Sequence, residues 1–212
     1  MLDWNQITSF LTVAVILTLM PGPDILFVAA QSMTKSRLGG IAVALGLCTG
    51  LLVHTTAAAL GVSAVVLSSE GALFAVKALG AAYLLYLAWK TWSGRHAGAT
   101  PASETAPAAK SFRFGALYRR GITMNVINPK VSLFFLALLP QFVSEQSGSI
   151  PLQMLQLGLL FIAQALVIFT CVSLLSGFAG GIVTGRSPKW APRLAVVEAV
   201  IYVLLTVNLF LL

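Results

Sequence analysis

The stretches PGPD (residues 21–24) and NPK (residues 128–130) each interrupt an apolar run that is otherwise long enough to cross a membrane. Proline removes a backbone donor and clashes with the preceding helical turn. An ionisable side chain at mid-membrane depth costs about 2.5–3.5 kcal/mol on insertion scales, so both features need a compensating reason. Because the combination occurs once in each half of the chain, it indicates a transporter's binding site built from two broken helices.

The composition is that of a membrane protein. Of the 212 residues, 58% are hydrophobic and only 9% are charged, whereas soluble proteins average about 45–50% apolar and about 25% charged residues. A soluble core is therefore excluded. The length suffices for about six spans of about 20 residues each. No stretch resembles a separate soluble domain, so we expect a single membrane domain.

Six apolar runs can form these spans. We predict an all-α membrane protein of six transmembrane helices at about 6–31, 38–67, 72–91, 121–143, 152–183 and 194–212, with spans one and four broken at prolines. The segment 93–111, rich in Ala, Pro, Ser, Thr and Gly, is predicted to be a cytoplasmic linker between a first repeat (1–92) and a second repeat (112–212) of the single transporter domain. Three spans per half is an odd number, so the halves are expected to form an inverted repeat.

The basic residues predict orientation rather than nucleic-acid binding. The net charge is +7, but the basic side chains lie in short loops and not on one amphipathic face, so no nucleic-acid partner is expected. The loops after spans one, three and five carry all of them except Lys77 and Lys130, which fall within spans, and the other side receives no Lys or Arg. By the positive-inside rule those loops are cytoplasmic and both termini lie outside. The start of the chain lacks the basic region of a cleavable signal peptide, so span one is expected to be retained.

The first interruption combines a backbone break with an acid. Pro21 and Pro23 lack an N–H, and Gly22 tolerates unusual dihedrals, so carbonyls of the preceding turn should lose their partners. The half-helix that follows begins with a partial positive charge. Such breaks are tolerated in lipid only where they face protein or a water-filled cavity. We therefore interpret Asp24 as a substrate or proton site; the alternative is a structural kink with Asp24 satisfied by a neighbour.

The second interruption repeats this logic with the opposite charge. Lys130 follows Asn128 and Pro129 inside a span and needs an anion, either Asp24 or a substrate carboxylate. The alternative is that the Lys130 side chain snorkels to the membrane interface, but its aliphatic stem is too short to reach the interface comfortably. Asn128 is expected to orient Lys130 or to bind substrate. The two opposite charges together suit a zwitterionic solute.

Other polar residues in the spans carry weaker signals. His54 and Thr49 in span two and Gln164 in span five could line a polar path, with His54 as a proton relay; each alone is more often an interhelical hydrogen bond. Lys77 and Glu198 are expected near opposite membrane faces, in structural roles.

Gly46 and Gly50 form a GxxxG pattern that should allow close helix packing. That packing could serve a homodimer or could lie within one subunit. Cys48 and Cys171 fall inside apolar runs, where free cysteine behaves as a small hydrophobe. No Cys/His cluster suggests a metal site, and no cofactor is expected.

Three segments, in this order, form a recognisable pattern: PGPDILFVAAQSMTKSRLGGIAVALGLCTG, KALGAAYLLYLAWKTW and NPKVSLFFLALLPQF. Together they resemble the LysE/RhtB superfamily of bacterial amino-acid exporters, most closely the homoserine, homoserine lactone and threonine exporters, over essentially the whole chain apart from the linker. The resemblance implies a multi-pass protein of the bacterial inner membrane that exports small neutral amino acids by proton antiport. Its motif residues correspond here to residues 21–24 and 128–130. In YRRGITMNVINPK, Arg119 and Arg120 replace plainer polar residues of many relatives, which leaves the exported amino acid open.

Other functions need features that this chain lacks or carries weakly. Export of another solute, such as a basic or branched amino acid, an organic amine or a divalent cation, is the nearest alternative. A divalent cation needs a cluster of oxygen or sulfur ligands, whereas here one central acid accompanies a lysine. A membrane-embedded enzyme needs a nucleophile with a base, or a metal, and no HExxH, GxSxG or phosphate-binding loop is present. A passive channel differs from an antiporter by its indifference to a pH gradient.

Overall fold

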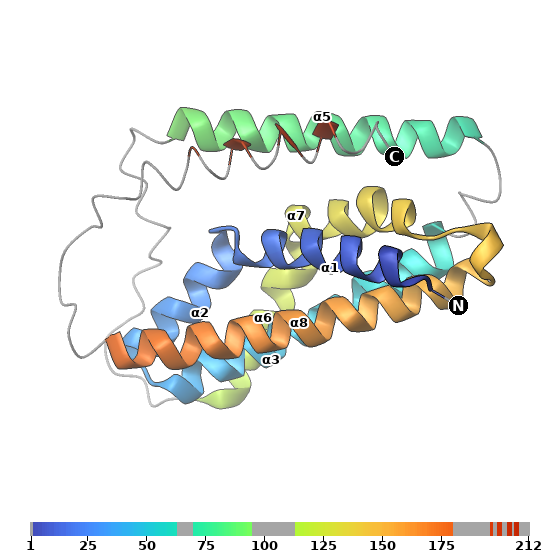
Figure 1. Cartoon of the computed structure of the whole chain (residues 1–212). Helices are drawn as coiled ribbons and strands as arrows, with labels where there is room; N and C mark the ends of the chain where they lie inside the picture. The colour runs from blue at the N-terminus through green and yellow to red at the C-terminus, as the bar shows by residue number, and fades with distance from the viewer. Residues whose placement is uncertain are drawn as a thin grey trace.

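The computed structural model describes residues 2–62, 70–94 and 113–179, together with positions 196, 199, 200, 203, 204, 206 and 207. Within these residues all regular structure is helical (Figure 1). The elements in chain order are α1 (Trp4–Leu19), α2 (Pro23–Thr34), α3 (Arg37–Ala57), η1 (Ala58–Val62), α5 (Glu70–Gly94), α6 (Phe114–Ile127), α7 (Pro129–Leu133), η2 (Phe134–Leu138), η3 (Leu139–Phe142), η4 (Glu145–Ser147) and α8 (Ile150–Ala179). The predicted all-α architecture is confirmed.

Two spans are broken at the predicted prolines. The axis bends by 55° between α1 and α2 and by 49° between α6 and the segment Pro129–Phe142, and each bent pair is together long and apolar enough to cross a membrane. In the described part of the chain, Arg37–Gly61 and Ile150–Phe178 meet the same criterion as single helices. In both bent pairs the second half begins with a proline, which can occupy the first helical turn because no intrahelical partner needs its N–H.

The fourth span begins earlier than predicted. We expected 121–143, but α6 starts at Phe114. Arg119 and Arg120 lower the apolar signal there without ending the helix, and the Arg120 guanidinium lies 5.0 Å from the centre of the Phe27 ring on α2. Counted from their observed starts, α1 has 16 residues and α6 has 14, so both breaks follow first halves of nearly equal length.

Helix α3 is the centre of the bundle and packs closely on α6. A Cβ added at Gly46 would collide with the main-chain carbonyl of Tyr118, and one at Gly50 would lie 2.7 Å from the Cβ of Asn125. The GxxxG face is therefore used inside the subunit. The GxxxG face therefore no longer supports a homodimer, and the homodimer stays a prediction.

The remaining helices pack on this pair or on one another. Helix α8 packs against α3, α2 and α1, while α5 contacts the bundle through η2 (Figure 1). A cluster of buried phenylalanines joins α1, η2, η3 and α8, with ring centres 4.9–6.5 Å apart: Phe10, Phe134, Phe135, Phe142 and Phe161. The third predicted span, 72–91, lies within α5. The linker and most of the sixth span lie outside the described residues.

Candidate functional site

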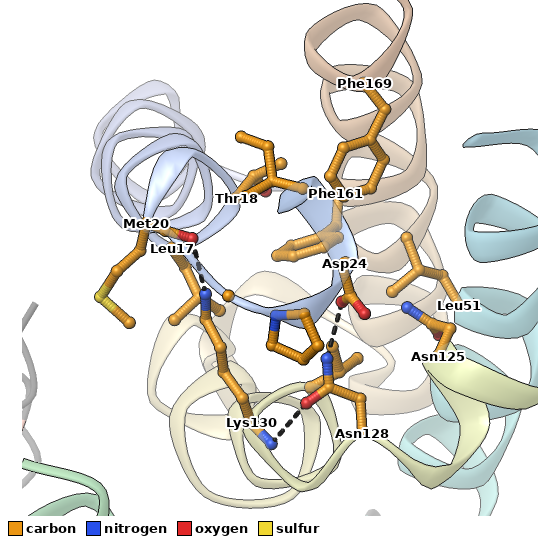
Figure 2. A pocket seen from close by; sticks show the side chains of 14 residues that line it. Leu17, Thr18, Met20, Asp24, Leu51, Asn125, Asn128, Lys130, Phe161 and Phe169 are labelled. Carbon is orange, nitrogen blue, oxygen red and sulfur yellow. Dashed lines mark hydrogen bonds between the residues drawn. The ribbon is translucent and has the colours of Figure 1, made fainter. Parts of the chain in front are cut away.

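The two breaks meet, and one side chain joins them. Asp24 lies in the first turn of α2, and Asn128 is the N-cap of α7. The Asn128 amide Nδ2 donates to Asp24 Oδ2 over 2.7 Å, and its Oδ1 accepts from the backbone N–H of Lys130 over 3.1 Å (Figure 2). The same amide therefore caps a half-helix of the second half and binds the acid of the first half.

Lys130 makes the second connection between the halves. Its ammonium Nζ donates to the main-chain carbonyl of Met20 over 3.3 Å (Figure 2). Lys130 lies at the start of α7, where the helix dipole disfavours a cation, and Met20 lies at the C-terminal end of α1, where the dipole favours one. The ammonium also attracts the Asp24 carboxylate electrostatically. Each break is thus stabilised by a group from the other.

His54 supports the second break. Pro129 has no N–H, so the carbonyl of Asn125 lacks its usual helical donor four residues on. That carbonyl accepts instead from the Asn128 N–H over 2.9 Å and pairs with His54 Nε2 over 3.1 Å. Because a carbonyl only accepts, Nε2 carries the hydrogen. The buried His54 ring also packs at 5.8 Å from the Phe135 ring.

A small cavity lies where the two breaks meet, with a volume of about 30 Å³. Its polar side chains are those of Thr18, Asp24, Asn125, Asn128 and Lys130, and the rest of its lining consists of Leu17, Met20, Gly22, Pro23, Ile25, Leu51, Val131, Phe161 and Phe169 (Figure 2). Such a volume holds about two water molecules. It is much smaller than an amino acid, so the helices around the cavity must separate before a solute of that size can enter.

Sequence reasoning missed Asn125. Its side chain is 1% exposed, and its Oδ1 is buried without a hydrogen-bond partner, as is Oδ1 of Asp24. A single amide in an apolar run is not distinctive. The available signal was its position one turn before Asn128, which places both amides on one helical face.

The other predicted polar residues lie at different distances from this cavity. Gln164 Nε2 donates to the hydroxyl of Thr18 over 2.9 Å, so it contacts the cavity lining. Thr49 shares a hydrogen bond of 2.9 Å with the Tyr118 hydroxyl on α6 and does not line the cavity. The polar path that we expected from His54, Thr49 and Gln164 stays a prediction. Lys77 is half-buried on α5, and Glu198 lies outside the described residues.

Comparison with known proteins gives consistent matches. The family model described as LysE type translocator matches residues 15–211. The homoserine/homoserine lactone efflux protein of Salmonella typhimurium is 32% identical over 162 residues, which cover 76% of each chain. An uncharacterized membrane protein of Vibrio cholerae is 29% identical over 194 residues, covering 91% of this chain and 90% of its own. The uncharacterized membrane protein YrhP of Bacillus subtilis is 28% identical over 159 residues, covering 73% and 75%. No solved structure matches the chain.

Proposed function

Because the chain belongs to the family of LysE type translocators, as its motifs predicted, we propose that it exports small neutral amino acids such as homoserine, homoserine lactone or threonine. The export takes place across the inner membrane of a bacterium, in exchange for protons. Both termini lie outside, because the basic loops remain in the cytoplasm. The solute crosses chemically unchanged.

One observation carries the proposal: an acid and a base from the two halves line the same cavity at two helix breaks. A zwitterionic amino acid presents an ammonium and a carboxylate on one carbon. Asp24 and Lys130 supply the two complementary charges, and half-helix ends of opposite polarity add to each. Export of a divalent cation is less favoured, because the Lys130 ammonium repels cations.

The present contacts of Lys130 indicate how the substrate binds. In this closed arrangement the Lys130 ammonium takes the Met20 carbonyl, an acceptor suited to the ammonium of a substrate. When substrate enters, its ammonium binds the Met20 carbonyl and the unpaired Oδ1 of Asp24, and Lys130 turns to the substrate carboxylate. The first N–H groups of α2 have no intrahelical acceptor and add donors for the carboxylate.

Competition at Asp24 then couples transport to protons. A proton and the substrate ammonium both bind the same carboxylate, so each displaces the other. The two halves rock around the cavity and expose it alternately to the two sides, which gives exchange of the amino acid for a proton. The lining residue Phe161 belongs to the phenylalanine cluster and packs against Phe10 and Phe134 in this arrangement.

The experiment is counterflow of labelled amino acids in proteoliposomes, with homoserine, threonine, serine, leucine and lysine as the panel, together with a pH-sensitive dye inside the vesicles. We expect homoserine or threonine to exchange and to drive proton movement. Asp24→Asn should abolish the substrate-driven proton flux. Asp3→Asn, which changes an exposed carboxylate at the start of α1, is the matched control and should preserve it. Unchanged proton flux in Asp24→Asn would overturn the mechanism, and flux indifferent to an imposed pH gradient would identify a channel.

A further inference from the structure

Two of the five polar side chains that line the cavity already have their hydrogen bonds engaged within the protein. The Thr18 hydroxyl donates to the Ala14 carbonyl over 2.8 Å and accepts from Gln164 over 2.9 Å. Asn128 uses its amide nitrogen for Asp24 and its amide oxygen for the backbone of α7. Neither group is available to a solute without breaking a contact that holds the bundle together.

Asn125 differs from both. Its Oδ1 is buried without a partner, and its amide nitrogen makes no hydrogen bond to any of the described residues. Figure 2 shows the amide turned toward Asp24 at the edge of the cavity. Under the proposed function the two charged groups, Asp24 and Lys130, bind the ammonium and the carboxylate of the substrate. Asn125 is then the polar group in the described lining that remains for the rest of the solute.

We propose that Asn125 binds the side-chain hydroxyl of the substrate and selects hydroxylated amino acids over apolar amino acids of the same size. This inference rests on the proposed function and names the substrate class of that site. A hydroxyl both donates and accepts, and a carboxamide does the same, so the two groups satisfy each other. The other side chains near Asn125, such as Leu51 and Phe161, offer a hydroxyl no partner, and a buried polar group without a partner is strongly disfavoured.

The position of Asn125 is fixed by its surroundings. Its carbonyl is held by the backbone of Asn128 and by His54 Nε2. Gly50 on α3 leaves the space that the side chain occupies, since a Cβ there would lie 2.7 Å from the Asn125 Cβ. A group held on both sides in this way is preorganised for hydrogen bonding, which is the condition under which a site discriminates between solutes.

The test compares homoserine with norvaline, in which a methyl group replaces the terminal hydroxyl, in counterflow into proteoliposomes. The measured quantity is the ratio of kcat/KM for the two solutes on the same protein. We expect the unaltered protein to prefer homoserine by about tenfold to a hundredfold or more, because binding norvaline would leave the buried amide unpaired. Asn125→Leu, which keeps the number and branching of the heavy atoms and removes both polar atoms, should abolish or invert this preference.

Gln141→Leu is the matched control. Gln141 also has a buried amide oxygen without a partner, but it does not line the cavity, so its variant should keep the homoserine preference. If little Asn125→Leu is recovered folded, Asn125→Ala gives the same comparison, and the ratio is independent of the amount of protein. Exchange of homoserine with an unchanged preference in the Asn125 variants would overturn the inference and leave the proposed function standing. Exchange of neither homoserine nor threonine by the unaltered protein would overturn both.

Discussion

Replacing Gly46 by alanine should separate α3 from α6 and lower stability. The added Cβ would collide with the Tyr118 carbonyl oxygen and would lie 2.9 Å from the Tyr118 carbonyl carbon and 3.0 Å from the Gly121 Cα. All three atoms are main chain, so no side chain can turn aside and the helices must move. Overpacking of this kind costs about 1–3 kcal/mol. It outweighs the gain of about 0.5–1 kcal/mol that alanine normally brings to a helix.

Gly115→Ala is the matched control for this variant. It makes the same chemical change on α6, at a position where a Cβ meets nothing within 4 Å. Only the backbone-entropy gain of up to about 1 kcal/mol applies there, so we expect a small stabilisation. The two glycine replacements should therefore change stability with opposite signs.

Thermal unfolding in detergent with a thiol-reactive fluorophore measures the difference. Cys48 is 6% exposed and Cys171 is exposed, so a Cys171→Ser background leaves one thiol that reports unfolding. At about 2–4 °C per kcal/mol for a chain of this size, Gly46→Ala should melt several degrees below Gly115→Ala. A melting temperature for Gly46→Ala equal to or above that of Gly115→Ala would refute the packing argument. A decrease that depends on protein concentration would instead place the GxxxG face between subunits.

Replacements at two further positions test the supports of the second break. His54→Ala removes the donor to the Asn125 carbonyl and should lower the free energy of unfolding by about 1–3 kcal/mol, while His54→Gln, whose amide also donates, should recover part of that loss. Exchange driven by a pH gradient should persist in both variants. Its loss in a folded His54→Gln protein would identify the histidine as a proton carrier. Asn128→Leu should destabilise by about 2–5 kcal/mol, since it removes a hydrogen bond to the Asp24 carboxylate and the N-cap of α7. Asn128→Asp keeps the cap acceptor, so it should melt above Asn128→Leu. Because it places a second carboxylate against Asp24, it should nevertheless fail in counterflow.

The helix breaks could be predicted because proline acts locally. The missing N–H and the ring clash at residues 21, 23 and 129 depend on no other part of the chain, and both bends occur where these prolines lie. The predicted start of the fourth span was too late, because two arginines lower the apolar signal of a segment that is nevertheless helical. Charge alone did not reveal that Arg120 packs against an aromatic ring of α2.

The partners in the site could be predicted only in part. Two opposite charges suggested that the halves face one another, but the side chain that joins them is Asn128, which binds Asp24 across 104 residues of sequence. Lys130 donates to a main-chain carbonyl, and His54 donates to another. Every residue has such a carbonyl, so the sequence does not show which carbonyls lose their helical donor and accept from a side chain instead.

The contact between Lys130 and the Met20 carbonyl separates two properties that usually change together. Met20 is one of the residues that line the cavity, and its main-chain carbonyl connects one half of the protein to the other. Any residue at position 20 provides the same carbonyl, so a mutation there can change the lining of the cavity without removing the hydrogen bond to Lys130. Relatives that export different solutes could therefore diverge at this position freely, and the lysine would show no compensating change. Substrate specificity can evolve at position 20 while the contact between the two moving halves stays the same.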